Sequence, residues 1–335
     1  MASILEGQSK VSASSCHANL YLRMDQSASV FALRDSALLV SFKPSLKADV
    51  VSFPKTDPEF SFVVAQSFVT SNKQVTGPIH YNLRVVECTL AAQVLAKIFR
   101  LKKPLPKDES PLGSSLRGFH DAFFEQEEGI SDNTQTSPEK FQEQLKRLVQ
   151  ITEDYLPQEE GYTREQISSL LGITVDELNE KYTTKVPVRA EQFKLRQRAL
   201  HVFSEALRVQ HFMDLLNAKD EDPKQLAGKL GQLLNETQDS CRDAYECSCP
   251  EIDELCEIAR SAGAYGSRLT GAGWGGCCVH LVPSDKVEAV KSAWRTKYYA
   301  KRFPELSEEE LEEAIVVSKP GRGSLTWDVS AKSSV

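Results

Sequence analysis

The sequence predicts an α+β fold in which a sheet domain is interrupted by a long helical insertion. β-Branched and aromatic runs at residues 37–42 and 60–68 come first, and two further apolar runs at 277–282 and 315–317 come last. The segment between these two groups carries helical spacing and helix-start patterns. Strands that flank a block of helices in this order indicate an α+β arrangement.

The first helices are expected at residues 81–98 and 138–155. Seven apolar side chains share one helical face between Leu83 and Ile98. Ser137, Pro138 and Glu139 then combine an N-cap, a proline in the first turn and an acidic residue at the positive helix end. These signals predict two helices of ordinary length.

Later helices are expected from capping boxes and prolines. The boxes at 163–166 and 174–177 predict two short helices, with Gly172 ending the first. We expect one long helix over 187–217. Pro223 and Pro250 are expected to open two more helices, and residues 287–298 another.

Residues 102–136 are polar and contain several prolines, so we expect a long surface insertion there. The whole polar and helical insertion is expected at about 100–240, inside a domain of 59–330. Residues 1–23 are Ser-rich and aperiodic and predict a poorly ordered leader.

Composition limits the class of function. The chain has 335 residues, 41% hydrophobic and 26% charged, with a net charge of −7. The acidic balance argues against nucleic acid and anionic membranes as partners. No apolar run is long enough to span a bilayer and no secretory signal is evident, so a cytoplasmic location is expected. Four of the eight cysteines lie in 241–256, but their spacing does not suit zinc, and no metal-ligating residue is predicted.

A glycine-rich loop is the strongest functional signal. Residues 265–277 read Tyr-Gly-Ser-Arg-Leu-Thr-Gly-Ala-Gly-Trp-Gly-Gly-Cys, directly before a predicted strand. Glycine permits positive φ and close approach, so backbone N–H groups of such a loop can surround an anion. A tight connection with packing glycines is the alternative that the loop alone leaves open.

This string resembles the third sequence motif of the galactokinase, homoserine kinase, mevalonate kinase and phosphomevalonate kinase superfamily. Further segments resemble galactokinases, and the fungal ones most, over about nine tenths of the chain. They are Met-Asp-Gln-Ser-Ala-Ser at 24–29, Ser-Phe-Lys-Pro at 41–44, Ser-Asn-Lys at 71–73, Tyr-Asn-Leu-Arg-Val-Val-Glu at 81–87, Tyr-Glu-Cys-Ser-Cys-Pro-Glu-Ile-Asp at 245–253 and Val-Ser-Lys-Pro at 317–320.

The resemblance implies a two-domain sugar-kinase fold, ATP and Mg²⁺ as cofactors, and D-galactose as substrate. It implies that Asp25 is the catalytic aspartate, which also contacts the sugar, and that Tyr81 binds the sugar. The residues implied in ATP binding are Asn72, Lys73, Gly271, Ala272, Gly273, Gly275 and Gly276. Arg84 and Glu87, three residues apart on a helix, are interpreted as a structural ion pair instead of ligands.

Two galactokinase motifs are not found in the 335 residues: the Gly-Glu-His signature that binds sugar and the Gly-Leu-Ser-Ser-Ser loop that binds phosphates. The resemblance begins abruptly at Met24. We therefore expect an N-terminally truncated chain in which 24–58 is a remnant of the N-terminal domain, and we expect its activity to be impaired.

The sequence leaves the function open between alternatives. One is a sugar-1-kinase that makes galactose 1-phosphate and ADP. Another is a non-catalytic galactose and ATP sensor that acts as a transcriptional inducer by contacting a regulatory protein. A third is a product with no function of its own. Galactose and N-acetylgalactosamine are not distinguished, and neither is the oligomeric state.

Overall fold

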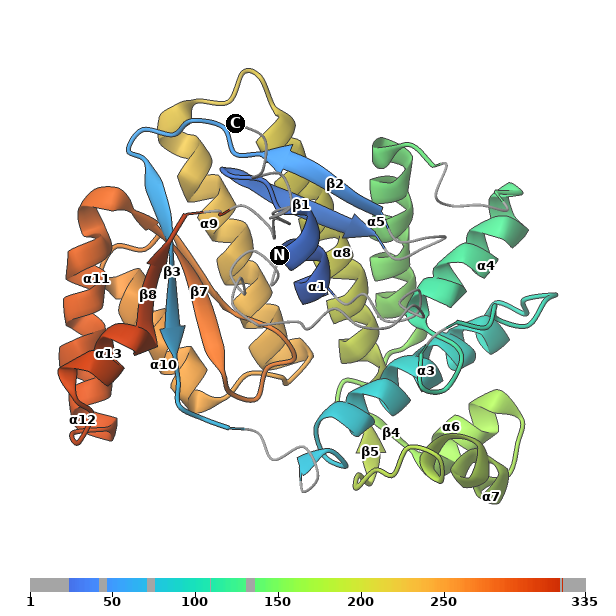
Figure 1. Cartoon of the computed structure of the whole chain (residues 1–335). Helices are drawn as coiled ribbons and strands as arrows, with labels where there is room; N and C mark the ends of the chain where they lie inside the picture. The colour runs from blue at the N-terminus through green and yellow to red at the C-terminus, as the bar shows by residue number, and fades with distance from the viewer. Residues whose placement is uncertain are drawn as a thin grey trace, which may run out of the picture.

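The computed structural model describes residues 24–41, 47–70, 76–108, 110–130, 136–319 and 321. A four-stranded antiparallel sheet with the order β6-β7-β3-β8 forms its centre (Figure 1). These strands are β6 (Gly266–Leu269), β7 (Cys277–Pro283), β3 (Phe60–Gln66) and β8 (Ile315–Ser318). The predicted α+β class is confirmed. In the described part of the chain, no helix is both long and apolar enough to cross a membrane.

Both faces of the central strand pair are covered. On one face, Val63 and Ala65 of β3 pack with Cys278 and Val282 of β7, under α10 (Pro250–Ser261) and α11 (Val287–Trp294). On the other face, Phe62 packs against α8 (Leu195–Asn217) and α9 (Pro223–Asp239). Because the strands are covered on both sides, their apolar residues run nearly without interruption.

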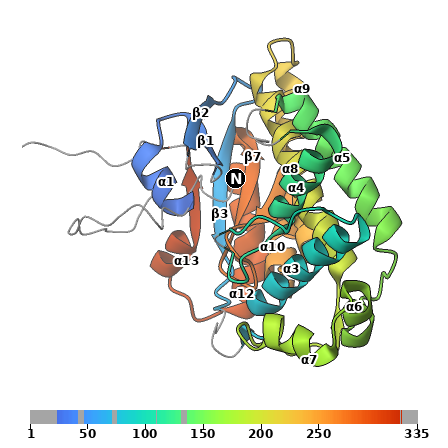
Figure 2. The same ribbon diagram turned by 90° about the vertical axis from the view of Figure 1, so that its right-hand side faces the viewer.

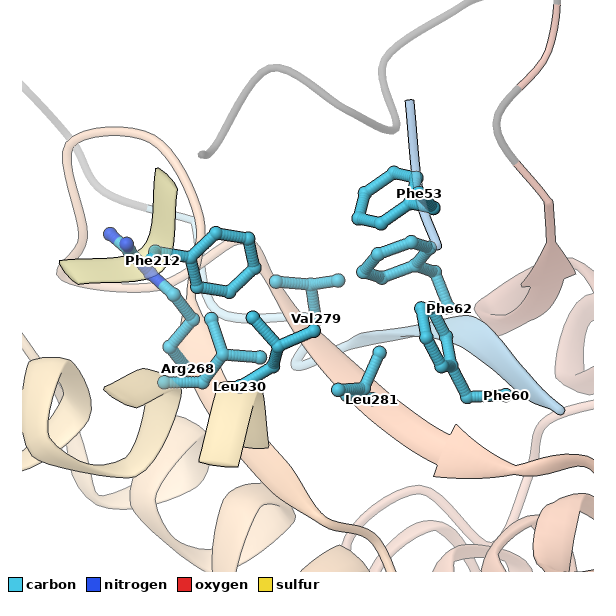
Figure 3. Close-up of a pocket in the computed structure, with 9 residues that line it drawn as sticks. Phe53, Phe60, Phe62, Phe212, Leu230, Arg268, Val279 and Leu281 are labelled. Atoms are coloured by element: carbon cyan, nitrogen blue, oxygen red, sulfur yellow. The ribbon is translucent and has the colours of Figure 1, made fainter. Parts of the chain in front are cut away.

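A second, two-stranded sheet contributes to the core on the α9 face. β1 (Ser36–Ser41) pairs antiparallel with β2 (Lys47–Ser52), and Val51 of β2 joins the cluster around Phe62. The rings of Phe53, Phe60 and Phe62 meet one another edge-on or tilted, with centroids 5.5–5.9 Å apart (Figure 3). The pocket between these rings and Leu230 has only about 10 Å³ of free volume, so it is packed core and not a binding site.

The helical part has its own core. α3 (Tyr81–Ile98) lies at its centre and packs on α4 (Leu116–Glu128), α8 and α6 (Arg164–Leu171), while α5 (Pro138–Tyr155) packs along α8 (Figures 1 and 2). The shorter elements are α1 (Met24–Phe31), β4 (Tyr162–Thr163), α7 (Val175–Leu178), β5 (Gln192–Phe193), α12 (Ala300–Arg302), α13 (Glu308–Ala314), π-helical turns at Asn179–Thr183, Ser240–Ala244 and Arg295–Tyr299, and a 3₁₀ turn at Ser284–Lys286.

Most helix predictions are confirmed. α3 and α5 have the expected bounds, and both capping boxes are formed, with Thr163 and Thr174 as N-caps. Gly172 ends α6 in the left-handed conformation with φ of 72°. Pro223 and Pro250 begin α9 and α10.

Three expectations are wrong. Residues 102–136 are not simply a surface insertion, because α4 lies within them and buries Phe119, Phe123 and Phe124 against α3. The long helix begins at Leu195 and not at 187, since 192–193 pair as a strand with β4. Strands β2 and β6 were not expected, because β2 is half exposed and β6 begins inside the glycine-rich string.

The closest helix-to-sheet contact is between α9 and β6. A Cβ placed on Gly231 of α9 would lie 2.4 Å from the carbonyl carbon of Tyr265, and one on Gly266 would lie 2.1 Å from the Gly231 carbonyl oxygen. This approach lets α9 side chains satisfy the outer edge of β6. Asn235 Oδ1 accepts the Ser267 N–H at 3.0 Å, and Gln238 Oε1 accepts the Leu269 N–H at 2.8 Å. The unpaired edge of the sheet is thus closed by a helix.

Replacing Gly231 with alanine is expected to lower the free energy of unfolding by about 1–3 kcal/mol, because the added methyl group meets backbone that cannot rotate away. Gly228, one turn earlier on α9, has open space around its Cβ position. Gly228→Ala is the matched control and is expected to be neutral or to stabilise by about 0.5–1 kcal/mol. Urea unfolding of both variants tests this, and equal stabilities would contradict the packing described.

Candidate active site

A polar cavity of about 290 Å³ opens where the start of α3, the middle of α8 and the loop between β6 and β7 meet. Of the residues implicated by the sequence, Tyr81, Gly271 and Ala272 line it. The other lining residues are Arg84, Val85, His201, Glu205, Cys241, Tyr245, Cys247, Arg268, Leu269 and Trp274. The structure therefore brings the predicted sugar-binding tyrosine and the predicted phosphate-binding loop to one cavity.

The glycine-rich loop, residues 270–276, turns the chain sharply between β6 and β7. Thr270 N–H and its hydroxyl both donate to the Cys277 carbonyl at 3.0 Å, which closes the base of the loop. Four glycines and Trp274 have positive φ between these points: 65° at Gly271, 85° at Gly273, 54° at Trp274, 130° at Gly275 and 78° at Gly276. Because a backbone with positive φ is strained for residues that carry a side chain, glycine is favoured at these positions.

Two backbone contacts hold the loop in place. Trp274 N–H donates to the Cys247 carbonyl at 2.6 Å, and Gly276 N–H donates to the Val69 carbonyl at 3.0 Å. A Cβ on Gly273 would lie only 2.0 Å from the Cys247 carbonyl oxygen. The loop thus packs between the 245–249 segment and the residues that directly follow β3.

The remaining loop amides are available to a ligand. Within the described part of the chain, the N–H groups of Gly271, Ala272, Gly273 and Gly275 donate to no acceptor. Successive amides that follow a positive-φ turn form a concave anion site. These amides are thus without an acceptor among the described residues, and their use in phosphate binding stays a prediction.

His80 connects the start of α3 to this loop. Its ring stacks on Trp274 with centroids 4.9 Å apart and planes within 5°. Burial and the nearby Arg84 lower the pKa of His80, so the ring that stacks is neutral at neutral pH. Tyr81 follows directly and is 55% exposed, so its hydroxyl is free to meet a ligand from the cavity. The stack explains how two distant segments share one cavity.

A buried ion network supports the floor of the cavity. Arg84 Nε lies 2.7 Å from Glu87 Oε2, which confirms the predicted structural ion pair. Arg198 of α8 pairs with the same carboxylate at 2.7 Å and with Glu246 at 2.8 Å. Lys194 completes the set by pairing with Glu246. Because each buried charge has a partner, Arg84 can face the cavity from a fixed position.

Glu205 pairs with Arg268, the second arginine that lines the cavity. Its carboxylate accepts from Arg268 at 3.2 Å, from Arg208 at 3.0 Å and from the Thr237 hydroxyl at 2.8 Å. Arg268 lines both the apolar pocket beside Phe212 (Figure 3) and the polar cavity. Burial would raise the pKa of Glu205, but the two arginines outweigh it and the net shift is downward.

His201 and Tyr245 close the cavity from the side. Their rings stack with centroids 4.4 Å apart, and His201 Nδ1 is 2.9 Å from the Ser240 hydroxyl. Burial lowers the pKa of His201 to about 4, so it is neutral at pH 7. Two guanidinium groups and one carboxylate then face the cavity, which leaves an excess of positive charge. Such a cavity suits an anionic ligand.

Other predicted site residues lie outside the cavity or outside the described residues. Gly273, Gly275 and Gly276 belong to the loop but do not line the cavity. Asp25 lies in α1, and only its backbone is described. Figure 2 shows α1 beside the β1–β2 hairpin, on the side of β3 away from α3. Asn72 and Lys73 are outside the described residues.

The sequence interpretation missed His201, Glu205 and Arg268. A signal was present: Arg198, His201, Glu205 and Arg208 recur at helical spacing on α8 and place charge on a face that is otherwise apolar. Charged residues at core positions of a predicted helix indicate a buried network or a site. Arg268 lay inside the glycine-rich string and was treated only as part of it.

Comparisons with known proteins identify relatives of this chain. The family described as GHMP kinases C terminal matches residues 223–300, which include α9, α10, the glycine-rich loop and β7. Galactokinase from Saccharomyces cerevisiae is 43% identical over 316 residues, covering 91% of this chain and 59% of the relative. Galactokinase from Schizosaccharomyces pombe is 38% identical over 307 residues, covering 90% of this chain and 59% of the relative.

Among solved structures, Lactococcus lactis galactokinase complexed with galactose aligns at a TM-score of 0.48 with 21% identity, covering 90% of this chain and 55% of that one. Mevalonate kinase of L. major in complex with R-mevalonate aligns at a TM-score of 0.38 with 15% identity, covering 90% of this chain and 53% of that one.

Residues 223–300 therefore match the C-terminal domain of the GHMP kinase superfamily. Within that superfamily, galactokinases are homologues of this chain, at 38–43% identity over about nine tenths of it. The chain spans about three fifths of the length of these curated relatives.

Gly273→Ala is expected to displace the loop, because the methyl group would fall on the Cys247 carbonyl oxygen. Gly271→Ala is the matched control, since its Cβ position is open and only its positive φ is strained, by about 1–2 kcal/mol. We expect the Gly273 variant to lose about 1–3 kcal/mol more stability than the control in urea unfolding. If both variants lose the same amount, the contact with Cys247 does not position the loop.

Proposed function

We propose that this chain carries part of a galactokinase-type active site, which binds ATP and D-galactose and transfers the γ-phosphoryl group to the anomeric hydroxyl. The products would be galactose 1-phosphate and ADP. The observation that supports this most is that Tyr81 and the Gly271–Ala272 amides line one cavity with excess positive charge. The names of the relatives point to the same sugar and the same chemistry.

Each lining group has a proposed role. The Tyr81 hydroxyl hydrogen-bonds a sugar hydroxyl while its ring packs on the pyranose face. The free amides around Gly271 and Ala272 donate to phosphate oxygens, and Gly273, Gly275 and Gly276 keep the loop in its positive-φ shape. Asn72 and Lys73 are assigned to the nucleotide from the resemblance alone. Arg84 and Arg268 offset the negative charge of the bound phosphates.

Asp25 is proposed as the catalytic carboxylate. It would accept the proton of the anomeric hydroxyl and aim that oxygen at the γ-phosphorus. Phosphoryl transfer depends mainly on positioning and charge neutralisation, so one oriented carboxylate suffices as the base. Its helix, α1, lies beside the β1–β2 hairpin and apart from α3. The proposal therefore requires that further parts of the sugar site place the substrate within reach of both Asp25 and Tyr81.

Magnesium is not assigned to any residue of this chain. Across the described ranges, no three side chains of His, Cys, Asp or Glu gather in a way that could hold a metal ion. We also propose a cytoplasmic location, which suits the absence of disulfide bonds among the described cysteines.

A fusion tests the kinase proposal. The N-terminal two fifths of the Saccharomyces cerevisiae relative would be joined ahead of Met24 to supply the motifs that are not found in these 335 residues. We expect the fusion to show galactose-dependent ADP release and Asp25→Asn to abolish nearly all of it without changing the unfolding midpoint. A rate within tenfold of the parent, about 1.4 kcal/mol in barrier, would remove Asp25 from the catalytic role.

The 335-residue chain alone is the control, and it is expected to give no turnover. Preorganised positioning contributes about 7–11 kcal/mol to such reactions, so partial loss of the site should abolish rate and not merely reduce it. Turnover by the chain alone, abolished by Asp25→Asn, would contradict this account. A fusion that binds both ligands by calorimetry but releases no ADP would favour the sensor function.

A further inference from the structure

Two cysteine thiols lie next to each other in the wall of the polar cavity. Cys241 is in the π-helical turn Ser240–Ala244, and Cys247 follows that turn; both line the cavity and are 4% exposed. The Cys247 N–H donates to the Cys241 carbonyl at 2.9 Å. With standard bond lengths, this contact limits the separation of the two Cα atoms to roughly 6.8 Å. That limit lies at the upper end of the range that a disulfide spans.

The two thiols are chemically unequal. The hydrogen bond between them lowers the pKa of Cys241 and raises that of Cys247. Burial opposes the shift at Cys241 and adds to the rise at Cys247, and the Arg268 guanidinium favours the thiolate form of both. Thiolates are the nucleophiles in thiol chemistry, so Cys241 is the attacking sulfur and Cys247 the resolving one.

A second thiol pair offers an internal comparison. Cys256 of α10 and Cys278 of β7 also lie close enough to interact, but both are fully buried in the core beneath α10 and α11, and Cys278 Sγ donates to the Ala65 carbonyl at 3.4 Å. Burial raises the pKa of Cys278 well above its usual value. Neither lines the cavity. Proximity is therefore common to both pairs, whereas contact with the cavity belongs only to the Cys241–Cys247 pair.

We propose that Cys241 and Cys247 form a reversible regulatory disulfide when a small peroxide enters the cavity. The Cys241 thiolate attacks one peroxide oxygen, the O–O bond breaks, and the leaving hydroxide takes a proton to become water. The Cys247 thiol then attacks the sulfenic sulfur, its S–H proton is released to the departing oxygen, and a second water leaves as the S–S bond forms. Two electrons pass from the thiols to hydrogen peroxide.

This disulfide is coupled to the glycine-rich loop through main chain. The Cys247 carbonyl accepts the Trp274 N–H at 2.6 Å and lies against Gly273, so moving Cys247 toward Cys241 pulls on residues 273–274. Trp274 in turn stacks on His80 at the start of α3. Oxidation should therefore displace the loop amides. Its effect on nucleotide binding rests on the proposed function, whereas the disulfide itself does not.

Graded hydrogen peroxide on the purified full chain tests the proposal. Remaining thiols would be alkylated after unfolding, and the peptides mapped by mass spectrometry. We expect a Cys241–Cys247 link to form first, with the loss of two hydrogen atoms, and to be reversed by dithiothreitol. Cys256 and Cys278 should stay alkylatable. Tryptophan emission should shift in step with the link, and Cys247→Ser should abolish that shift and leave a sulfenic acid on Cys241 that dimedone traps.

Two results would overturn the proposal. One is that Cys241 and Cys247 both remain alkylatable at peroxide levels that modify Cys256 or Cys278. The other is that dimedone traps Cys247 in Cys241→Ser but not Cys241 in Cys247→Ser, since the attacking sulfur would then be misassigned. The disulfide could form while neither the reduced nor the oxidised chain binds ATP. That result would support the proposed Cys241–Cys247 disulfide and would contradict the proposed nucleotide site.

Discussion

The contact on which the site depends is the hydrogen bond from Trp274 N–H to the Cys247 carbonyl, together with the close approach of Gly273 to the same oxygen. It attaches the glycine-rich loop to the segment that carries Tyr245 and Glu246. Through the His80–Trp274 stack it also fixes the start of α3, where Tyr81 lies. A loop of five positive-φ residues has little conformational preference of its own, so neighbouring main chain must define its shape.

The electrostatics of the cavity follow from the same packing. Arg84 and Arg268 are taken out of water, which is costly unless each has a carboxylate partner in good geometry. Glu87 and Glu205 supply these partners, and both are themselves shared with a second arginine on α8. The cations are thereby held rigidly toward the cavity, ready for an anionic ligand without reorganisation.

Sequence patterns predicted the parts of the fold that local chemistry determines. Caps at Ser137 and Thr163 and the apolar face of α3 gave helix positions that the structure confirms. They could not locate β6, whose edge is satisfied by Asn235 and Gln238 from another element. The glycine-rich loop and Tyr81 were identified by resemblance, but their meeting in one cavity depends on long-range contacts such as the His80–Trp274 stack. His201 can be identified as a site residue only from the packing of α8 against the glycine-rich loop, which local sequence patterns do not determine.

The central proposal is that the free amides of residues 271 and 272 receive the phosphates of a nucleotide. Hydrogen–deuterium exchange of the full chain with a non-hydrolysable ATP analogue measures this directly, because those amides donate to no described acceptor and should exchange fast in the free chain. The account predicts that saturating analogue slows exchange at residues 271 and 272 while the amides of β7 change little. Saturable binding with unchanged exchange at these two residues would contradict it.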